Sequence, residues 1–409
     1  KKKRMPGLIS YNECDKTAQT NSQGYSFMNQ TRRVLSNIWH RIQAPLLPWL
    51  EDEMGALSRK QQQLVETLEV AQIESHIQYR GCRAGRPQEC RSSIARAYIA
   101  KAVYNMPTTE MLIDRLKTDI QLRRICGWER INEIPSQSTF SRAFSEFSES
   151  ELPSHIHSAI IEKNLGQQII GHISRDSTSI HARERPEKVI EKFDPKVIKK
   201  RGRPKKGEIR DKKPKTRIEK QLSGLKIKEM VDDLPVCCNV GTKRNSKGYK
   251  TSWVGYKLHI DCADGGIPVS CLLSSASLHD SQVAIPLATI THQKVTSCYD
   301  LMDAAYDVPQ IKQHSESLGH VPIIDENPRR SKERKKEIKL EQKGRKYAGY
   351  KLAENIRYNE RSTVERVNGR LKDDFNGRMV RVKGAKKVMA HLMFGIIALT
   401  TSQLMKIII

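Results

Sequence analysis

The chain has 409 residues, 37% apolar and 29% charged, which is long enough for two or three soluble domains with a sizeable buried core. Lys and Arg total 72 against 46 Asp and Glu, giving a formal net charge of +26, too large for a neutral solvated surface. Such an excess indicates a polyanionic partner, nucleic acid first of all, although charge alone leaves open a ribosome-like or merely basic protein.

The cysteines and the chain ends predict a reduced, cytoplasmic protein. Nine scattered cysteines without a C-x-x-C pair argue against a disulfide framework and against a structural zinc site. The basic start, residues 1–4, is not followed by an apolar run, so no signal peptide is expected. The apolar end, residues 388–409, is interrupted by polar side chains, which favours a buried terminal helix over a membrane span.

The first 165 residues are predicted to be helical, with residues 1–60 a helical or flexible segment and residues 61–165 a DNA-binding domain. Residues 108–125 are expected to form one amphipathic helix. Its apolar residues recur every three or four positions, at Met111, Leu112, Leu116, Ile120 and Ile125. A second amphipathic helix, opening near residue 136, carries Phe140, Phe144 and Phe147. Two such helices suit a helix-turn-helix-like unit, and a plain helical bundle is as consistent with the pattern.

From residue 167 onward the pattern predicts strands that alternate with helices. Residues 169–175 suggest a strand that ends at Asp176, and residues 295–301 suggest a strand that ends just before Asp303. Further strands are expected at residues 254–260, 267–273 and 321–324, and helices at residues 280–291 and 308–318. A β-hairpin followed by alternating strands and helices indicates a mixed α/β sheet.

Two strongly basic stretches interrupt this pattern. Residues 199–220 hold twelve basic and three acidic residues, and residues 329–346 hold ten basic and three acidic. Neither has an apolar face, so both are expected to be loops or extended arms unless a partner orders them.

Three carboxylates have the placement that metal-dependent phosphodiester chemistry requires. Such chemistry needs hard oxygen ligands, converging from separate elements, to hold two magnesium ions. Asp176 and Asp303 end two predicted strands, and Glu365 lies in a predicted helix over residues 355–375. Tyr358, Arg361, Glu365 and Lys372 are spaced by three, four and seven residues, which places them on one helix face. Periodicity alone would favour an ordinary charged surface helix.

The pattern Tyr358-x2-Arg361-x3-Glu365-x6-Lys372 resembles the Tyr-Arg-Glu-Lys signature of the DDE transposases of bacterial insertion sequences, in the insertion-sequence-four group. Four blocks agree with that family in order, although each alone is weak. They are residues 175–180 for the first aspartate, 255–259 and 278–281 for the hairpin and its turn, and 303–307 for the second aspartate. The resemblance covers roughly residues 105–405, and its helical part is similar to the N-terminal domain of related transposases.

This resemblance implies a ribonuclease-H-like catalytic domain over residues 166–180 and 251–409, preceded by the helical DNA-binding domain. It implies that Asp176, Asp303 and Glu365 are catalytic and bind Mg²⁺, for which Mn²⁺ can substitute. Contacts to double-stranded DNA are then expected from Tyr358, Arg361, Arg366 and Lys372. The family further implies a homodimer that joins two transposon ends and a target DNA, with no membrane association.

The chain departs from the family in two places. Ala305 stands where the family usually has glycine, and Asp300 and Asp307 are rivals of Asp303 that spacing cannot rank. Only 61 residues separate Asp303 from Glu365 while 126 separate the two aspartates, so the expected insertion lies between the aspartates, at residues 181–250.

The insertion contains Arg201-Gly-Arg203-Pro within a lysine-rich run, which looks like an AT-hook. Glycine and proline favour a thin extended backbone, and a narrow minor groove focuses negative potential on arginine. A solvated basic linker is the equally weighted alternative.

These observations predict a DNA transposase that cleaves element ends and joins them to target DNA. The alternatives are a ribonuclease-H-like nuclease that cuts without joining strands, and an inactive transposase-derived DNA-binding protein.

Overall fold

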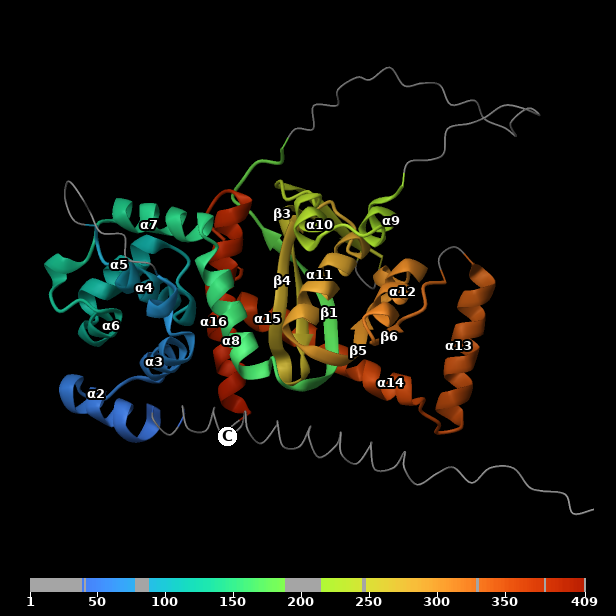
Figure 1. The fold of residues 1–409 in the computed structure, drawn as a ribbon, viewed down its shortest axis with the longest axis horizontal. Helices are drawn as coiled ribbons and strands as arrows, with labels where there is room; N and C mark the ends of the chain where they lie inside the picture. Colours follow the sequence, from blue (N-terminus) through green and yellow to red (C-terminus); the bar gives the residue numbers. More distant parts are fainter. Residues whose placement is uncertain are drawn as a thin grey trace, which may run out of the picture.

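Helices form the first part of the chain and a mixed sheet with its covering helices forms the second (Figure 1). The structure, a computed structural model, describes residues 39, 42–77, 88–187, 215–244, 248–328, 331–378 and 380–407. The two arginines of the AT-hook-like motif, Arg201 and Arg203, lie outside these described residues.

The described residues up to 165 contain helices and turns but no strand. The longer helices are α2 (Leu47–Met54), α3 (Arg59–Ala71), α4 (Arg91–Val103), α5 (Thr109–Thr118), α6 (Ile120–Cys126), α7 (Gln137–Glu149) and α8 (Leu152–Leu165). The predicted phenylalanine face of α7 is confirmed, because Phe140, Phe144 and Phe147 are all buried. Their rings surround Tyr98 of α4, with centroid distances of 4.8 to 6.4 Å.

The single helix expected over residues 108–125 is wrong. Asp119 ends α5, and its side chain accepts a hydrogen bond from Leu122 N at 2.9 Å, which caps the start of α6. The break turns Met111 and Ile120 outward, where they are 50% and 55% exposed. A side-chain cap inside an apolar repeat therefore produced two short helices instead of one.

Six strands of the described chain form one sheet in the order β2-β3-β1-β5-β6, with β4 also paired to β3. They are β1 (Ile169–His181), β2 (Asn239–Arg244), β3 (Lys250–Ala263), β4 (Ile267–Ser275), β5 (Thr296–Met302) and β6 (Val321–Ile324). β1, β3 and β4 pair antiparallel, whereas β5 is parallel to β1 and β6 is parallel to β5. The expected mixed α/β architecture is confirmed.

The first strand was predicted to end at Asp176, but β1 continues to His181. Its antiparallel partner β3 holds it through the pair His181↔Gly255, a contact that depends on residues far along the chain. Only the parallel pairing with β5 stops near the aspartate, at Arg175↔Met302. Asp176 therefore lies inside a strand, one residue beyond the last parallel pair.

Helices cover both faces of the sheet. The helices in this part of the described chain are α9 (Arg217–Leu222), α10 (Ile227–Asp232), α11 (Ser281–Lys294), α12 (Pro309–Ser317), α13 (Lys332–Tyr347), α14 (Ala353–Tyr358), α15 (Ser362–Asp374) and α16 (Ala385–Lys406). On β1, Arg175 reaches Asp261 beside Thr291 of α11, whereas its neighbour Asp176 meets Asn368 of α15. Since successive strand residues point to opposite faces, α11 and α15 lie on opposite sides of the sheet.

The basic stretches are more ordered than expected. The stretch 329–346 was predicted to be a loop or arm unless a partner orders it, but residues 332–347 form helix α13. This helix starts at a Ser331 cap that accepts from Arg334 N at 3.1 Å. Likewise, α9 begins within the other stretch, where Thr216 and Glu219 form a capping box. The caps, together with good helix formers and Glu–Arg pairs, allow helices without an apolar face.

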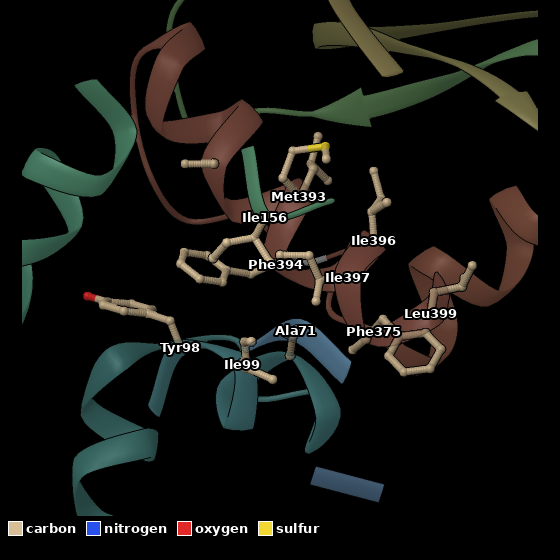
Figure 2. Close-up of a cluster of buried hydrophobic side chains, with 14 of the residues drawn as sticks. Ala71, Tyr98, Ile99, Ile156, Phe375, Met393, Phe394, Ile396, Ile397 and Leu399 are labelled. Atoms are coloured by element: carbon tan, nitrogen blue, oxygen red, sulfur yellow. The ribbon is translucent and has the colours of Figure 1, made fainter. Parts of the chain in front are cut away.

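The C-terminal helix α16 joins the two parts. It packs against α3, α4, α7 and α8 on one side and against β4 and α15 on the other. Figure 2 shows its side chains between the two parts, where Phe394 stacks on Tyr98 with centroids 5.6 Å apart. Gly395 permits α16 to approach the end of α15 closely, because a Cβ there would lie 2.5 Å from the Phe375 carbonyl oxygen. Of the helices described, only α16 is long and apolar enough to cross a membrane. Its most apolar stretch is 83% buried, as predicted for a core helix.

The seven cysteines within the described residues are free. Cys126, Cys238 and Cys262 are buried, while Cys90 and Cys298 are exposed.

Candidate active site

The three predicted carboxylates come from separate elements; Asp303 and Glu365 contact the Arg361 guanidinium, and Asp176 is near enough for its charge to act on it. Asp176 lies in β1, Asp303 directly follows β5, and Glu365 is in the first turn of α15. Arg361 Nη1 lies 2.5 Å from Glu365 Oε1, and its Nη2 lies 3.9 Å from Asp303 Oδ2. Burial lowers the pKa of Arg361, but Tyr358, Asp176 and the other two carboxylates together raise it above its usual value. The arginine thus balances the charge of all three.

Asp176 is held in an environment that disfavours its charge. Burial raises its pKa to about 6, and the negative charge of Asp303 adds to this, against a backbone hydrogen bond from Ser177 and the positive charge of Arg361. Asn368 Nδ2 donates to Asp176 Oδ2 at 3.3 Å. A nearby cation would stabilise the ionised form of a carboxylate whose pKa is raised by burial and by a second carboxylate.

Next to Asp176, a buried ion pair fixes β1 to β3. Arg175 Nε and Nη2 each donate to Asp261 at 2.7 Å, and Thr291 Oγ1 donates to Asp261 Oδ2 at 2.6 Å. Both side chains of the pair are nearly inaccessible, at 2% and 0% exposure. This bidentate pair sets the position of the strand on which Asp176 sits.

The three neighbouring aspartates near the end of β5 have different partners. Asp303 Oδ1 accepts from Ala305 N at 2.9 Å, and its other oxygen faces Arg361. Burial raises the pKa of Asp303. Asp300 is buried within the sheet, where it accepts from Ser315 and contacts His320. Asp307 pairs with Lys312 at 2.7 Å.

The turn after Asp303 accommodates alanine in place of the family's glycine. Residues Ala304–Tyr306 form the 3-10 turn η5, and Ala305 has no positive φ angle. The substitution therefore introduces no backbone strain at this position.

The helix predicted over residues 355–375 is divided. α14 and α15 are separated by the 3-10 turn η6 (Asn359–Arg361), so the predicted face is not one regular helix face. Tyr358 Oη donates to Asp325 Oδ2 at 2.6 Å. Asp325, one residue beyond β6, was missed in the sequence, although it follows a predicted strand as Asp303 does.

Further cations surround the carboxylates. Lys372 lies near enough to Asp176 for the aspartate charge to raise the pKa of Lys372, although burial lowers that pKa overall. Lys243 of β2 lowers the pKa of both Asp176 and Asp303, and no sequence pattern pointed to it because β2 is polar and is defined by pairing with β3. Arg366, by contrast, is exposed and hydrogen-bonds Thr363 of its own helix at 2.8 Å.

Three buried polar atoms at this site have no hydrogen-bond partner among the described residues. They are Tyr306 Oη, Arg361 Nε and Asn368 Oδ1. The Tyr306 hydroxyl lies near enough to Asp280, Asp176 and Asp303 for their charges to contribute to its raised pKa, after burial. Asn368 Oδ1 is an acceptor, whereas Tyr306 Oη and Arg361 Nε can donate. Unpaired buried donors are costly, so these two favour a ligand that supplies acceptors, as phosphate oxygens do.

As they stand, no three His, Cys, Asp or Glu side chains of the described chain converge closely enough to hold a metal ion. Glu365 is turned onto Arg361, and its side chain is 56% exposed. The donor chemistry nevertheless fits magnesium, because three carboxylates supply hard oxygen ligands and the Arg361 cation stands between them.

Comparison with known families gives two matches. Residues 171–401 match the family "Transposase DDE domain", a range that contains all three carboxylates. Residues 51–146 match the family "Transposase domain (DUF772)", which covers most of the helical part. No curated protein and no solved structure matches the chain.

Proposed function

The chain belongs to the Transposase DDE domain family, and on this premise we propose that it is a DNA transposase of an insertion sequence in the Tyr-Arg-Glu-Lys group. It would bind the inverted repeats at the ends of its element, hydrolyse a phosphodiester bond to free a 3′-hydroxyl, and join that hydroxyl to target DNA. The gathering of Asp176, Asp303 and Glu365 around Arg361 carries this proposal.

Asp176, Asp303 and Glu365 are the residues that would hold two magnesium ions, with manganese as a substitute. Bound there, the metals would supply activation of the attacking oxygen and stabilisation of the leaving one. Glu365 would have to release Arg361 to reach them. The freed guanidinium, whose Nε has no hydrogen-bond partner among the described residues, would then be available to a phosphate.

The cations beside the triad would grip the DNA backbone. We assign phosphate contacts to Arg361, Lys372 and Lys243, because these three cations lie near enough to the carboxylates to interact with their charges. Tyr358 and Arg366 are the further DNA contacts proposed from the family signature. The hydrogen bond from Tyr358 to Asp325 would orient the tyrosine ring.

The remaining parts of the proposal concern architecture and partners. The antiparallel strands β1, β3 and β4 followed by the parallel strands β5 and β6 support a ribonuclease-H-like domain. The helical part, residues 61–165, would recognise the element ends. The insertion over residues 181–250 would add a DNA contact through Arg201 and Arg203. We further propose a homodimer that acts on double-stranded DNA in the bacterial cytoplasm.

Strand joining separates a transposase from a plain nuclease. Purified protein is mixed with precut, labelled element ends, taken from the DNA that flanks the coding region, and with a supercoiled target plasmid and Mg²⁺. A transposase yields joined products, and none with EDTA. Cleavage of uncut ends without joining of precut ends would instead identify a nuclease, and Mg²⁺-independent binding without nicking would identify an inactive DNA-binding protein.

A further inference from the structure

Helix α13 stands apart from the rest of the fold. None of its 16 residues is buried, and Figure 1 shows it at the edge of the molecule, beyond α12 and α14. Leu340 is 68% exposed and Tyr347 is 96% exposed. A helix of this length without a buried residue is marginal in water, so its sequence does not serve a core.

Its charges are sorted onto two faces. One face carries lysines separated by four, three, four and three residues, a spacing that follows the helical repeat. They are Lys332, Lys336, Lys339, Lys343 and Lys346. The opposite face carries Glu337 and Glu341, which pair with Arg334 and Arg345 at 2.9 to 3.7 Å.

The lysine face is left without counter-charges. All five lysines are exposed, and none forms a hydrogen bond or ion pair with another described residue. Of the three acidic residues of the same helix, Glu337 and Glu341 are instead bound to its two arginines. Like charges three and four residues apart destabilise a helix by about 0.2–0.5 kcal/mol per pair, a cost that a bound polyanion would reverse.

We propose that the lysine face of α13 lies along the sugar-phosphate backbone of the DNA that enters the active site. This inference rests on the proposed function. The helix is placed beside the active site because α13 is followed in the chain by α14 and α15, which carry Tyr358 and Glu365. From Lys332 to Lys346 the face spans about 21 Å, the length of roughly six base pairs. Lysines bind phosphates as point charges, so the contact is independent of base sequence.

The test uses two full-length variants with equal loss of charge. The test variant is K336Q/K339Q/K343Q. The control variant, K383Q/K386Q/K406Q, removes three exposed lysines near the C-terminal helix α16, to which no DNA contact is assigned. Glutamine keeps helix propensity, and unchanged circular dichroism and melting temperatures show that both variants fold.

Binding to a labelled 50-base-pair element end is measured over a series of NaCl concentrations. Three lost phosphate contacts should lower the slope of log Kd against log salt by about 2 to 3 and weaken binding at low salt at least tenfold, while the control keeps nearly the wild-type slope. Equal slopes in both variants would overturn the inference. Mg²⁺-dependent cleavage by wild-type protein, measured on the same DNA, tests the proposed function separately, so either idea can fail without the other.

Discussion

Replacing Asp176 with asparagine should stabilise the metal-free protein while it removes activity. In the folded chain, burial and Asp303 raise the pKa of Asp176 from 3.8 to about 6. Ionising it at neutral pH therefore costs about 1 to 3 kcal/mol of folding stability, at 1.36 kcal/mol per pKa unit. The neutral amide in D176N would avoid that cost and could keep the contact with Asn368.

The stability gained in D176N should depend on pH, because it follows the ionisation of Asp176 in the wild-type protein. A carboxyl with a raised folded pKa binds more protons in the folded than in the unfolded state between pH 4 and pH 6, so wild-type stability falls as pH rises through that window. The gain from D176N should thus be near zero below pH 4 and complete above pH 6.

Urea unfolding in EDTA at pH 4 and pH 7.5 measures this difference, and D300N is the matched control. Burial alone would raise the pKa of Asp300, but His320, Arg175 and Ser315 together lower it, so its charge stabilises the fold. D300N should lose roughly 1 to 3 kcal/mol at pH 7.5. If D176N is less stable than wild type in EDTA at pH 7.5, the reasoning about Asp176 is wrong.

Three further substitutions test the surroundings of the site. R175M should lose about 3–5 kcal/mol of unfolding free energy in urea, because Asp261 is left buried without its arginine partner. The double variant R175M/D261L should recover most of that stability. A double variant whose loss is the sum of the two single losses would contradict this. Y306F should leave the melting temperature of the metal-free protein unchanged or higher, since the Tyr306 hydroxyl has no partner among the described residues; a clear loss would show a missed hydrogen bond. R361K should slow Mg²⁺-dependent cleavage about 100-fold or more while DNA affinity in gel-shift assays falls less than tenfold; unchanged cleavage would remove Arg361 from the site.

The elements that depend on local pattern were predicted well from the sequence. The hairpin of β3 and β4 follows from the turn at Gly265 and Gly266, and β6 occupies the residues expected for it. The phenylalanine face of α7 and the burial of α16 likewise follow from apolar periodicity and length. In these segments, local propensity and tertiary packing favour the same structure.

What the sequence could not predict depends on contacts between distant residues. The length of β1 is set by β3, and β2 with its Lys243 exists only through the same partner. Spacing made Asp300 and Asp303 equivalent, whereas their partners, His320 and Arg361, distinguish them. Helix α13 was missed because it has no apolar face, the signal on which helix prediction mostly depends.

Cleavage of a labelled element end by D303N and D307N tests the central claim most directly. Both variants remove one carboxylate from the same short segment, but only Asp303 faces Arg361, while Asp307 pairs with Lys312. With Mg²⁺, D303N should cut at least about 1000-fold more slowly than wild type while it still binds the DNA, and D307N should cut within a few-fold of wild type. Wild-type cleavage by D303N, or loss of cleavage in D307N alone, would contradict a nuclease centre built from Asp176, Asp303 and Glu365.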